Sequence, residues 1–266
     1  MSIGGVEMKV ACVQLDIVFG EPKENFLKVE EKIREAASLG ANTVVLPEMW
    51  NTGYDLTRLE EIADVNGEET KKLLSQLSKE LNIHIVGGSV SIKKGDKFYN
   101  TMYVTNSLGE VVGEYDKAHL IKLMDEHLYL EAGSEKNIFT LDGVKMGGII
   151  CYDLRFPEWT RAHSLNGAKV MFIPAQWPAK RIDHWKILLQ ARAIENQSFI
   201  IAVNRVGSDP HNEFGGNSMV ISPWGEIIWN GANQECVEIL DLNLEEIEEI
   251  RARIPVFSDR REELYR

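Results

Sequence analysis

Short apolar runs alternate along the chain with longer segments that have helical character. The apolar runs predict buried strands at residues 10–17, 43–46, 83–90, 144–150, 169–173 and 199–203. Apolar periodicity and terminal residues predict helices at residues 22–39, 69–81, 157–165 and 183–197, with one more after Asn243. Strands and helices that alternate in this way, without a low-complexity linker, predict an α/β chain with a layered architecture.

Residues with special backbone preferences mark where several helices begin and end. Pro22 suits a first helical position, and Gly40 suits the end of the same helix. Asp183 and Asn243 are expected to cap two later helices through their side-chain oxygens. The charged tail at residues 258–266 is expected to be extended or to lie on a partner.

Two hairpin-like segments, residues 102–112 and 219–228, resemble each other. Each contains a strand, a turn with a glycine and a second strand. The match suggests two related halves, although it is too short to establish a repeat.

Composition excludes several classes of protein. The chain has 266 residues, of which 44% are hydrophobic, which is enough for a large core and too much for a disordered chain. No apolar run reaches the roughly 18 residues of a membrane-spanning helix, and residues 1–16 lack the pattern of an export signal. A net charge of −12 disfavours binding to nucleic acid or to an anionic membrane.

The cysteines and histidines argue against disulfides and metals. Cys12, Cys151 and Cys236 are odd in number and far apart, which argues against a disulfide framework and favours a reducing compartment such as the cytoplasm. None of the six histidines has close metal-ligand spacing with a cysteine. We therefore expect no structural zinc.

Residues 147–158 have the pattern of a nucleophile turn. An apolar strand leads into Cys151, a polar turn follows, and Pro157 can open a helix. Such a turn exposes a nucleophile above a sheet and points backbone N–H groups at the reaction centre. A free thiol has a pKa near ~8.5 and reacts as the thiolate, so a base or a cation must lie nearby. Cys12 and Cys236 lie in ordinary strand-like runs and are expected to be structural.

Glu48 and Lys117 can supply that base and that cation. Glu48 follows an apolar strand, where a carboxylate can act as general base toward a thiol and later as acid toward ammonia. Lys117 lies in a polar turn, where an ammonium group can stabilise a developing oxyanion. Taken alone, each residue has a simpler interpretation: a solvated glutamate at a strand end, and a surface lysine paired with Asp116.

Together, the three segments closely resemble the nitrilase superfamily of carbon–nitrogen hydrolases. The segments are Leu46-Pro47-Glu48-Met49, Tyr115-Asp116-Lys117-Ala118-His119-Leu120 and the turn at residues 147–158, and the resemblance runs from residue 10 to about residue 241. It implies that Glu48, Lys117 and Cys151 form the catalytic triad and that no metal or organic cofactor is needed. It also implies a four-layer α-β-β-α sandwich and a homodimer formed through that sandwich. We expect one domain over residues 1–266, with a core at about 9–241 and a C-terminal helix and tail at 243–266.

The family also carries a second glutamate between the lysine and cysteine motifs. Alignment by eye on residues 126–133 selects Glu126, seven positions before Gly133, and Glu131 is the competing assignment. The resemblance implies that this glutamate positions the hydrolytic water. It also implies that Lys117 and the backbone N–H of Tyr152 stabilise the oxyanion.

Further segments resemble the bacterial omega-amidases, which act on ω-amides of 2-oxo dicarboxylic acids such as 2-oxoglutaramate and 2-oxosuccinamate. These segments are residues 151–157, 177–179, 184–185, 191–197 and 204–207. Such a substrate carries a free carboxylate, and Arg181 is the candidate cation for it, although a solvated basic pair at residues 180–181 is an equal alternative. Tyr54 and Trp177 are candidate pocket walls, although aromatic residues at such places often belong to the core. Arg155 and Glu158 are expected to brace the nucleophile turn as an ion pair.

Other activities stay open at this point. Within the superfamily, the rivals are a nitrilase proper, an N-carbamoyl amide hydrolase and a deaminated glutathione amidase. An enzyme with a Cys–His pair would depend on His119 or His127 instead of Glu48. A catalytically silent binding protein of the same fold is disfavoured because the glutamate, the lysine and the cysteine are all intact.

Overall fold

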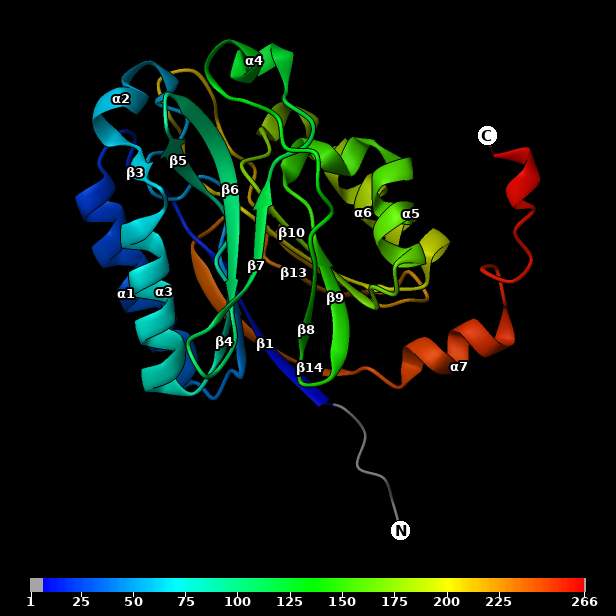
Figure 1. Cartoon of the computed structure of the whole chain (residues 1–266). Coiled ribbons are helices and arrows are strands. Elements are labelled where there is room, and N and C mark those ends of the chain that lie inside the picture. The colour runs from blue at the N-terminus through cyan, green and yellow to red at the C-terminus, as the bar shows by residue number, and fades with distance from the viewer. Residues whose placement is uncertain (1–6, 266) are drawn as a thin grey trace.

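Two β-sheets packed face to face form the centre of the protein, as seen in a computed structural model that describes residues 7–265 (Figure 1). The larger sheet has the strand order β14-β1-β2-β4-β6-β5-β3, with β7 paired to β6, and the smaller has the order β13-β12-β11-β10-β9-β8. The strands of the larger sheet are β1 (Glu7–Gln14), β2 (Thr43–Val45), β3 (Asp64–Val65), β4 (His84–Val86), β5 (Val90–Lys94), β6 (Lys97–Thr105), β7 (Val111–Asp116) and β14 (Cys236–Asn243). Those of the smaller sheet are β8 (Ile138–Leu141), β9 (Val144–Gly148), β10 (Val170–Ala175), β11 (Phe199–Asn204), β12 (Met219–Ile221) and β13 (Ile227–Asn230).

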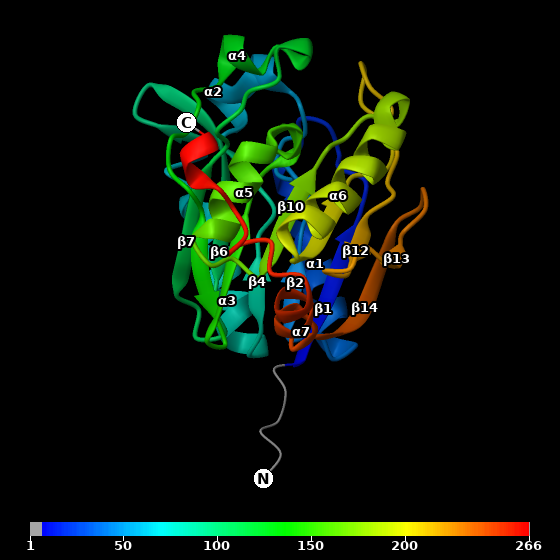
Figure 2. The same ribbon diagram turned by 90° about the vertical axis from the view of Figure 1, so that its right-hand side faces the viewer.

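Helices cover the outer face of each sheet. The α-helices are α1 (Pro22–Ser38), α2 (Leu59–Ile62), α3 (Glu68–Leu81), α4 (Glu126–Tyr129), α5 (Pro157–Leu165), α6 (Ile182–Asn196) and α7 (Glu246–Arg253). In Figures 1 and 2, α1 and α3 lie against the larger sheet, and α5 and α6 lie against the smaller one. The four-layer α-β-β-α sandwich is therefore confirmed. No helix in the described part of the chain combines the length and the apolar character needed to cross a membrane.

Strand β1 shows how the sequence builds these layers. Val10 and Cys12 belong to the apolar cluster between the two sheets, whereas Ala11 and Val13 belong to the cluster under α1 and α3. Side chains alternate between the faces of a strand, so a strand that is buried on both faces is apolar throughout. This explains why the strands appear in the sequence as continuous apolar runs.

Most predicted elements are confirmed, with shifted ends. Helix α1 begins at Pro22, and Gly40 follows its C-terminus with a φ of +91°. Both predicted hairpins form, as β6 with β7 and as β12 with β13. The single strand predicted at residues 83–90 is wrong, because Gly87, Gly88 and Ser89 separate β4 from β5.

The break at Gly88 has a steric cause that bears on the site. Its φ is +60°, and a Cβ atom there would lie 2.0 Å from the carbonyl oxygen of Pro47. Only glycine therefore lets this loop pack against the chain immediately before Glu48. The neighbouring Ser89 continues that contact, since its hydroxyl accepts a 2.9 Å hydrogen bond from the N–H of Met49.

The two predicted helix caps are wrong. Asp183 lies inside the first turn of α6, where the cap position is Arg181 and no side chain caps the helix. Asn243 is the last residue of β14, and its Oδ1 accepts a hydrogen bond from the N–H of Glu245 before α7 begins. Both polar side chains lie near a helix start, but one is inside the helix and the other is before it.

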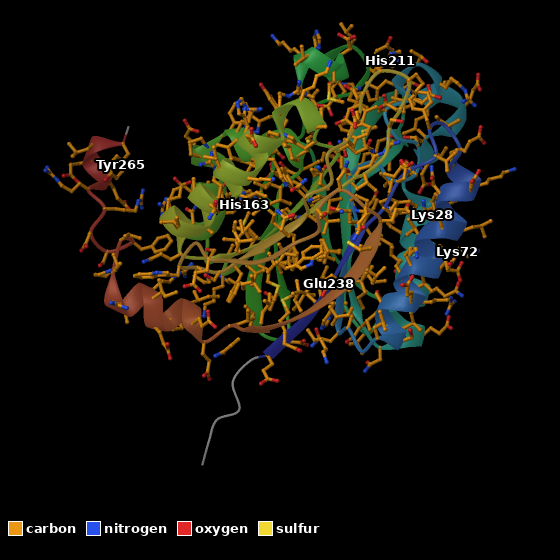
Figure 3. The ribbon with its side chains drawn as sticks, turned by 180° about the vertical axis from the view of Figure 1, so that it is seen from behind. Lys28, Lys72, His163, His211, Glu238 and Tyr265 are labelled. Carbon is orange, nitrogen blue, oxygen red and sulfur yellow. The ribbon has the colours of Figure 1, made fainter. Side chains whose placement is uncertain are left out.

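The C-terminal segment leaves the sandwich. Helix α7 still packs on the sandwich through the fully buried Ile247 and through Arg251, which donates to the carbonyls of Asn196 and Gln197. The residues after it project away (Figures 1 and 3), and Tyr265 lies at the far end of this extension in Figure 3. Leu264 and Tyr265 are each 61% exposed. The tail is not an extended strand, because a turn covers residues 256–259 and the 3₁₀ helix η5 covers Glu262–Leu264. That it lies on a partner stays a prediction. Arg266 and residues 1–6, including the first part of the segment judged for an export signal, lie outside the described residues.

Candidate active site

Glu48 lies at the carboxyl end of β2 and is completely buried. Its Oε1 accepts hydrogen bonds from Asn100 Nδ2 at 2.8 Å and from Lys117 Nζ at 2.8 Å. Its Oε2 accepts the backbone N–H of Gln176 at 2.8 Å. These donors come from β6, from the end of β7 and from the end of β10, so Glu48 joins both sheets.

Lys117 follows β7 and is also fully buried. Its Nζ lies 2.6 Å from Glu126 Oε1 and 2.8 Å from Glu48 Oε1. Burial lowers the pKa of this ammonium group, but the charges of Glu126 and Glu48 outweigh burial, so the pKa is raised overall. Lys117 is therefore protonated at neutral pH. An ammonium group has three protons, so one remains for a further acceptor.

Glu126 begins α4 and is the second buried carboxylate of this cluster. Its Oε2 accepts the N–H of Ile121 at 2.7 Å. Burial raises its pKa, Lys117 opposes that effect, and Glu48 adds to it. Glu131, the competing assignment, lies at the surface and forms a 3.4 Å ion pair with Lys97. The structure therefore places Glu126, and not Glu131, beside Lys117.

Cys151 sits on a sharp turn, as the sequence predicts. It is the first residue of the 3₁₀ helix η3 (Cys151–Arg155), three positions after the end of β9, and its φ is +45°. A non-glycine residue seldom has a positive φ, and such backbone strain is concentrated at functional sites. Burial, and then the charge of Glu48, raise the pKa of the Cys151 thiol, while Lys117 opposes them. The thiol is therefore protonated at rest, with a carboxylate and an ammonium close enough to influence it.

A small pocket opens beside Cys151. It is lined by Ile121, Met124, Cys151, Tyr152, Arg155, Trp177, Pro178 and Arg181. A larger surface depression lies elsewhere, where Gly20–Phe26 of the chain faces residues 58–69, and its lining contains no cysteine. Because the small pocket is lined by the strained Cys151, whose pKa is shifted by burial and by the charges of the buried Glu48 and Lys117, its chemistry marks it as the candidate active site.

The predicted pocket walls occupy different places. Trp177 is buried at the pocket, and its Nε1 donates a 2.8 Å hydrogen bond to the carbonyl of Arg181. Tyr54 is buried deeper, with its hydroxyl 2.9 Å from Glu126 Oε1 and 3.1 Å from Glu48 Oε1. Tyr54 thus bridges the two carboxylates. The substrate-binding roles of Tyr54, Trp177, Arg181 and Tyr152 stay predictions.

Two residues that the sequence did not single out hold Glu48 in place. Gln176 binds Glu48 twice, because its side-chain Nε2 also donates to the Glu48 carbonyl at 2.7 Å. Asn100 binds the carboxylate with its side chain, and its own carbonyl accepts the N–H of Lys117 at 2.9 Å. Gln176 follows an apolar strand as Glu48 does, and that repeated position was the available signal. Asn100 lies within a strand, where nothing in the sequence sets it apart.

Asp153 ties the lysine segment to the cysteine turn. It is fully buried and accepts hydrogen bonds from Tyr115 Oη at 2.6 Å, from the His119 N–H at 2.9 Å and from the Ile150 N–H at 2.9 Å. His119 Nδ1 also lies 2.7 Å from Asp153, and its ring stacks on Phe156. His119 therefore serves this network, and the role of Glu48 as the base for Cys151 stays a prediction.

The ion pair predicted between Arg155 and Glu158 is wrong. Arg155 instead places its guanidinium over the ring of Trp177, 4.7 Å from the centroid, with Nη2 3.3 Å from His184 Nδ1. Glu158 is exposed on the first turn of α5. The two side chains leave the turn in different directions because Pro157 starts a new helix between them.

Comparison with known proteins agrees with this geometry. The family model for carbon-nitrogen hydrolases matches residues 9–252. The chain is 51% identical to 2-oxoglutaramate amidase of Bacillus subtilis (strain 168) over 96% of this chain and 98% of the relative, and 32% identical to human omega-amidase NIT2 over 97% and 96%. A solved CN-hydrolase superfamily protein of Xanthomonas campestris, with an arsenic adduct in its active site, superposes with a TM-score of 0.89 at 29% identity, covering 96% of this chain and 97% of that one. The chain therefore belongs to the carbon-nitrogen hydrolase family.

Proposed function

We propose that this protein is an omega-amidase, which hydrolyses the terminal amide of a 2-oxo dicarboxylic acid monoamide to ammonia and a dicarboxylate. The observation that carries the proposal is the buried cluster of Glu48, Lys117 and Glu126 beside the strained Cys151. The relatives named 2-oxoglutaramate amidase and omega-amidase support the choice of 2-oxoglutaramate and 2-oxosuccinamate as substrates.

The first half of the reaction forms a thioester. Glu48 takes the proton of the Cys151 thiol as sulfur attacks the amide carbonyl, which avoids a free thiolate in a site that raises the thiol pKa. Lys117 and the backbone N–H of Tyr152 donate to the oxyanion. Glu48 then returns the proton to the amide nitrogen, the C–N bond breaks, and ammonia leaves.

The second half releases the acid. Water gives a proton to Glu48 and attacks the thioester carbonyl, and the C–S bond breaks as the Cys151 thiol regains a proton. Glu126 orients this water, which suits a carboxylate that shares Lys117 and Tyr54 with Glu48. The Lys117 charge lies between the two carboxylates and offsets their repulsion.

We also propose a cytoplasmic homodimer that binds no nucleic acid. Three free cysteines suit a reducing compartment, and a net charge of −12 disfavours an anionic partner. The projecting tail, with Leu264 and Tyr265 exposed, offers apolar surface to a second subunit. Sedimentation should show that the chain of 266 residues is a dimer. A chain that ends at residue 257 should form a weaker dimer. A monomer of the 266-residue chain would contradict the proposed assembly.

Ammonia release from a substrate panel tests the activity. We expect turnover of 2-oxoglutaramate and 2-oxosuccinamate at least about 100-fold above that of glutamine, asparagine and simple nitriles. Cys151→Ala is the matched control for any contaminating amidase. Turnover of nitriles alone, of N-carbamoyl amides alone, or of none of these compounds would overturn the proposal.

A further inference from the structure

The two carboxylate oxygens of Glu48 have different surroundings. Within residues 7–265, Oε1 accepts hydrogen bonds from Lys117 Nζ at 2.8 Å, from Asn100 Nδ2 at 2.8 Å and from the Tyr54 hydroxyl at 3.1 Å. In the same part of the chain, Oε2 accepts one hydrogen bond, from the backbone N–H of Gln176 at 2.8 Å. A carboxylate oxygen has two lone pairs, so Oε1 is fully occupied whereas Oε2 keeps one lone pair free. Oε2 is therefore the oxygen that can take a proton from the nucleophile.

Gln176 determines where that oxygen lies. Its backbone N–H donates to Oε2 of Glu48, and its side-chain Nε2 donates to the Glu48 carbonyl at 2.7 Å. Gln176 directly follows β10, and the N–H of the next residue, Trp177, donates at 2.6 Å to Oδ1 of Asn204, the last residue of β11. The backbone of Gln176 is thus held between a neighbouring strand and the carboxylate. A rotation of this peptide would move its N–H off Oε2 and allow the carboxylate to turn.

Arg205 holds the side chain of Gln176 in one orientation. The Nη1 atom of Arg205 donates a 2.9 Å hydrogen bond to Gln176 Oε1. A guanidinium group has donors only, so the amide oxygen must face Arg205 and the amide NH₂ must face the Glu48 carbonyl. A flipped amide would place two donors against each other at one end and two acceptors against each other at the other. The three residues therefore have a single arrangement that satisfies every contact.

The Arg205 guanidinium is itself fixed by both sheets. Its Nη2 donates to the carbonyls of Ile17 at 2.7 Å and Ser208 at 2.9 Å, and to Asp16 Oδ1 at 3.1 Å. It also lies over the ring of Phe214, 4.4 Å from the centroid. Asp16 and Ile17 follow β1 of the larger sheet, whereas Ser208 follows β11 of the smaller one. The guanidinium therefore cannot turn without losing contacts to both sheets.

A buried guanidinium is a costly way to join two sheets. The Arg205 side chain is completely buried, whereas that of its carboxylate partner Asp16 is 45% exposed. Burial lowers the pKa of Arg205, and the charge of Asp16 offsets that effect only in part. Apolar side chains of similar volume often join two elements at least as well, because a buried ion loses its hydration. A role in addition to stability explains why a cation lies here.

We propose that Arg205 is a positioning residue that acts through Gln176 to keep Oε2 of Glu48 turned toward the nucleophile. The proposal rests on the proposed function, in which Glu48 is the base, and deepens it by naming the residue that orients this base. Arg205 is not among the residues that line the Cys151 pocket, so it acts on the base and not on the substrate. A displacement of about 1 Å in a reacting group can lower a rate about 100-fold.

Steady-state kinetics with 2-oxoglutaramate give the first test. Arg205→Met removes all the hydrogen bonds of the guanidinium, and we expect kcat to fall about 30- to 100-fold while KM changes less than about threefold. Thr105→Val is the matched control, because it removes a buried 2.6 Å hydrogen bond to Ser78, and neither residue lines the pocket. The control should lower the melting temperature and leave kcat within about twofold. A loss in Arg205→Met that lies in KM alone would overturn the assignment.

A double-mutant cycle tests whether Arg205 acts through Gln176. Gln176→Met keeps the backbone N–H but loses the side-chain amide, so it should reproduce most of the loss in kcat. Because both changes break one chain of contacts, the double variant should be less than about threefold slower than the slower single variant. A loss equal to the product of the two single losses would overturn the assignment. If Arg205→Met does not fold, Arg205→Lys takes its place, since lysine keeps the charge but lacks the planar fork.

Alkylation of Cys151 by iodoacetamide supplies a measurement that needs no amide turnover. If Glu48 takes the thiol proton, Arg205→Met should slow this alkylation about 10-fold or more. In Glu48→Gln the base is already absent, so adding Arg205→Met should change the rate less than about twofold. A further large fall in that background would show that Arg205 acts on the fold and not on the base, which would overturn the assignment. If the unchanged protein releases no ammonia from 2-oxoglutaramate, the omega-amidase function fails, and the alkylation series still tests Arg205.

Discussion

Lys94 and Lys117 both lie beside strand β7, and each contacts two carboxylates. Their surroundings differ. Lys94 Nζ lies 2.9 Å from both Glu114 and Asp116. Lys117 Nζ lies 2.8 Å from Glu48 and 2.6 Å from Glu126. The Lys94 side chain is 31% exposed, whereas Lys117 and both of its partners are fully buried. Each cluster contains one lysine and two carboxylates, and the clusters differ in access to water.

This difference separates a structural contact from the one proposed to act in catalysis. An exposed ion pair contributes about 0–1 kcal/mol, because water solvates both charges when they part. A buried cluster costs desolvation energy for every charge and is a poor way to stabilise a fold. Perturbed, buried charges of this kind are concentrated where chemistry needs them. The comparison predicts that the same substitution in the two clusters will lower activity and stability much more in the buried cluster than in the exposed one.

Removing the lysine gives the largest contrast. Lys117→Met removes the proposed oxyanion donor and leaves two carboxylates without their lysine, so we expect kcat/KM for 2-oxoglutaramate to fall at least about 10³-fold. It should also cost about 3–5 kcal/mol of unfolding free energy. Lys94→Met should change kcat/KM less than about twofold. Ammonia release and urea denaturation measure the two quantities, and similar losses for both variants would break the comparison.

Changing one carboxylate in each cluster gives the next contrast. Glu48→Gln removes the proposed base and should lower kcat by about 10³-fold, because the thiol would then have no group to accept its proton. Glu114→Gln should leave kcat within about twofold. His127→Asn addresses the Cys–His alternative and should also leave kcat nearly unchanged. A near-normal rate for Glu48→Gln would remove Glu48 from the mechanism.

Asp153 sharpens the comparison, because it is buried beside the cluster without belonging to it. Asp153→Asn places an NH₂ group against donors from Tyr115 and Ile150, which should loosen the lysine segment and the cysteine turn. We expect kcat to fall about 10- to 100-fold with a smaller change in KM. Asp142→Asn is the matched control, since Asp142 contacts His84 at the surface. Equal kinetics for the two variants would contradict this positioning role.

The smallest expected effect is the pH dependence of the exposed cluster. Burial lowers the pKa of Lys94, but the hydrogen bonds that its ammonium donates to Asp116 and Glu114 outweigh burial and raise the pKa above 10.5. A raised pKa means that the pair stabilises the fold fully below pH 10.5, and that this contribution is lost as the pH rises further. The gap in unfolding free energy between the unchanged protein and Lys94→Met should therefore be under about 1 kcal/mol at pH 9 and shrink above pH 10.5. If the difference in unfolding free energy instead grew above pH 10.5, the raised pKa of Lys94 would be contradicted.

The sequence predicted the positions of strand ends better than the contacts made there. Glu48 and Cys151 each follow an apolar run, and Lys117 follows a hairpin, so a layered α/β fold places all three at one edge of the sheets. The resemblance to a family supplied their roles and the four-layer arrangement. Local sequence pattern does not give strand order, so spacing alone could not bring these residues together.

Side-chain direction was the part that the sequence could not supply. Arg155 and Glu158 are three residues apart, and their spacing suggested an ion pair, but Pro157 starts a helix between them. Tyr54 was expected to contact the substrate, and nothing in the sequence indicated that its hydroxyl also bridges two carboxylates. Gln176 and Asn100 contact Glu48 from opposite sheets, and such long-range contacts leave no periodic signal in the chain.

The central claim is that Cys151 carries the acyl group after ammonia leaves. Rapid acid quench of the protein with 2-oxoglutaramate, followed by peptide mapping by mass spectrometry, measures this directly. The predicted result is an acyl adduct, equal in mass to the substrate less ammonia, on the peptide that contains Cys151 and absent from Cys151→Ala. Ammonia release that proceeds in Cys151→Ala, or an adduct on Cys12 or Cys236 in its place, would contradict the account.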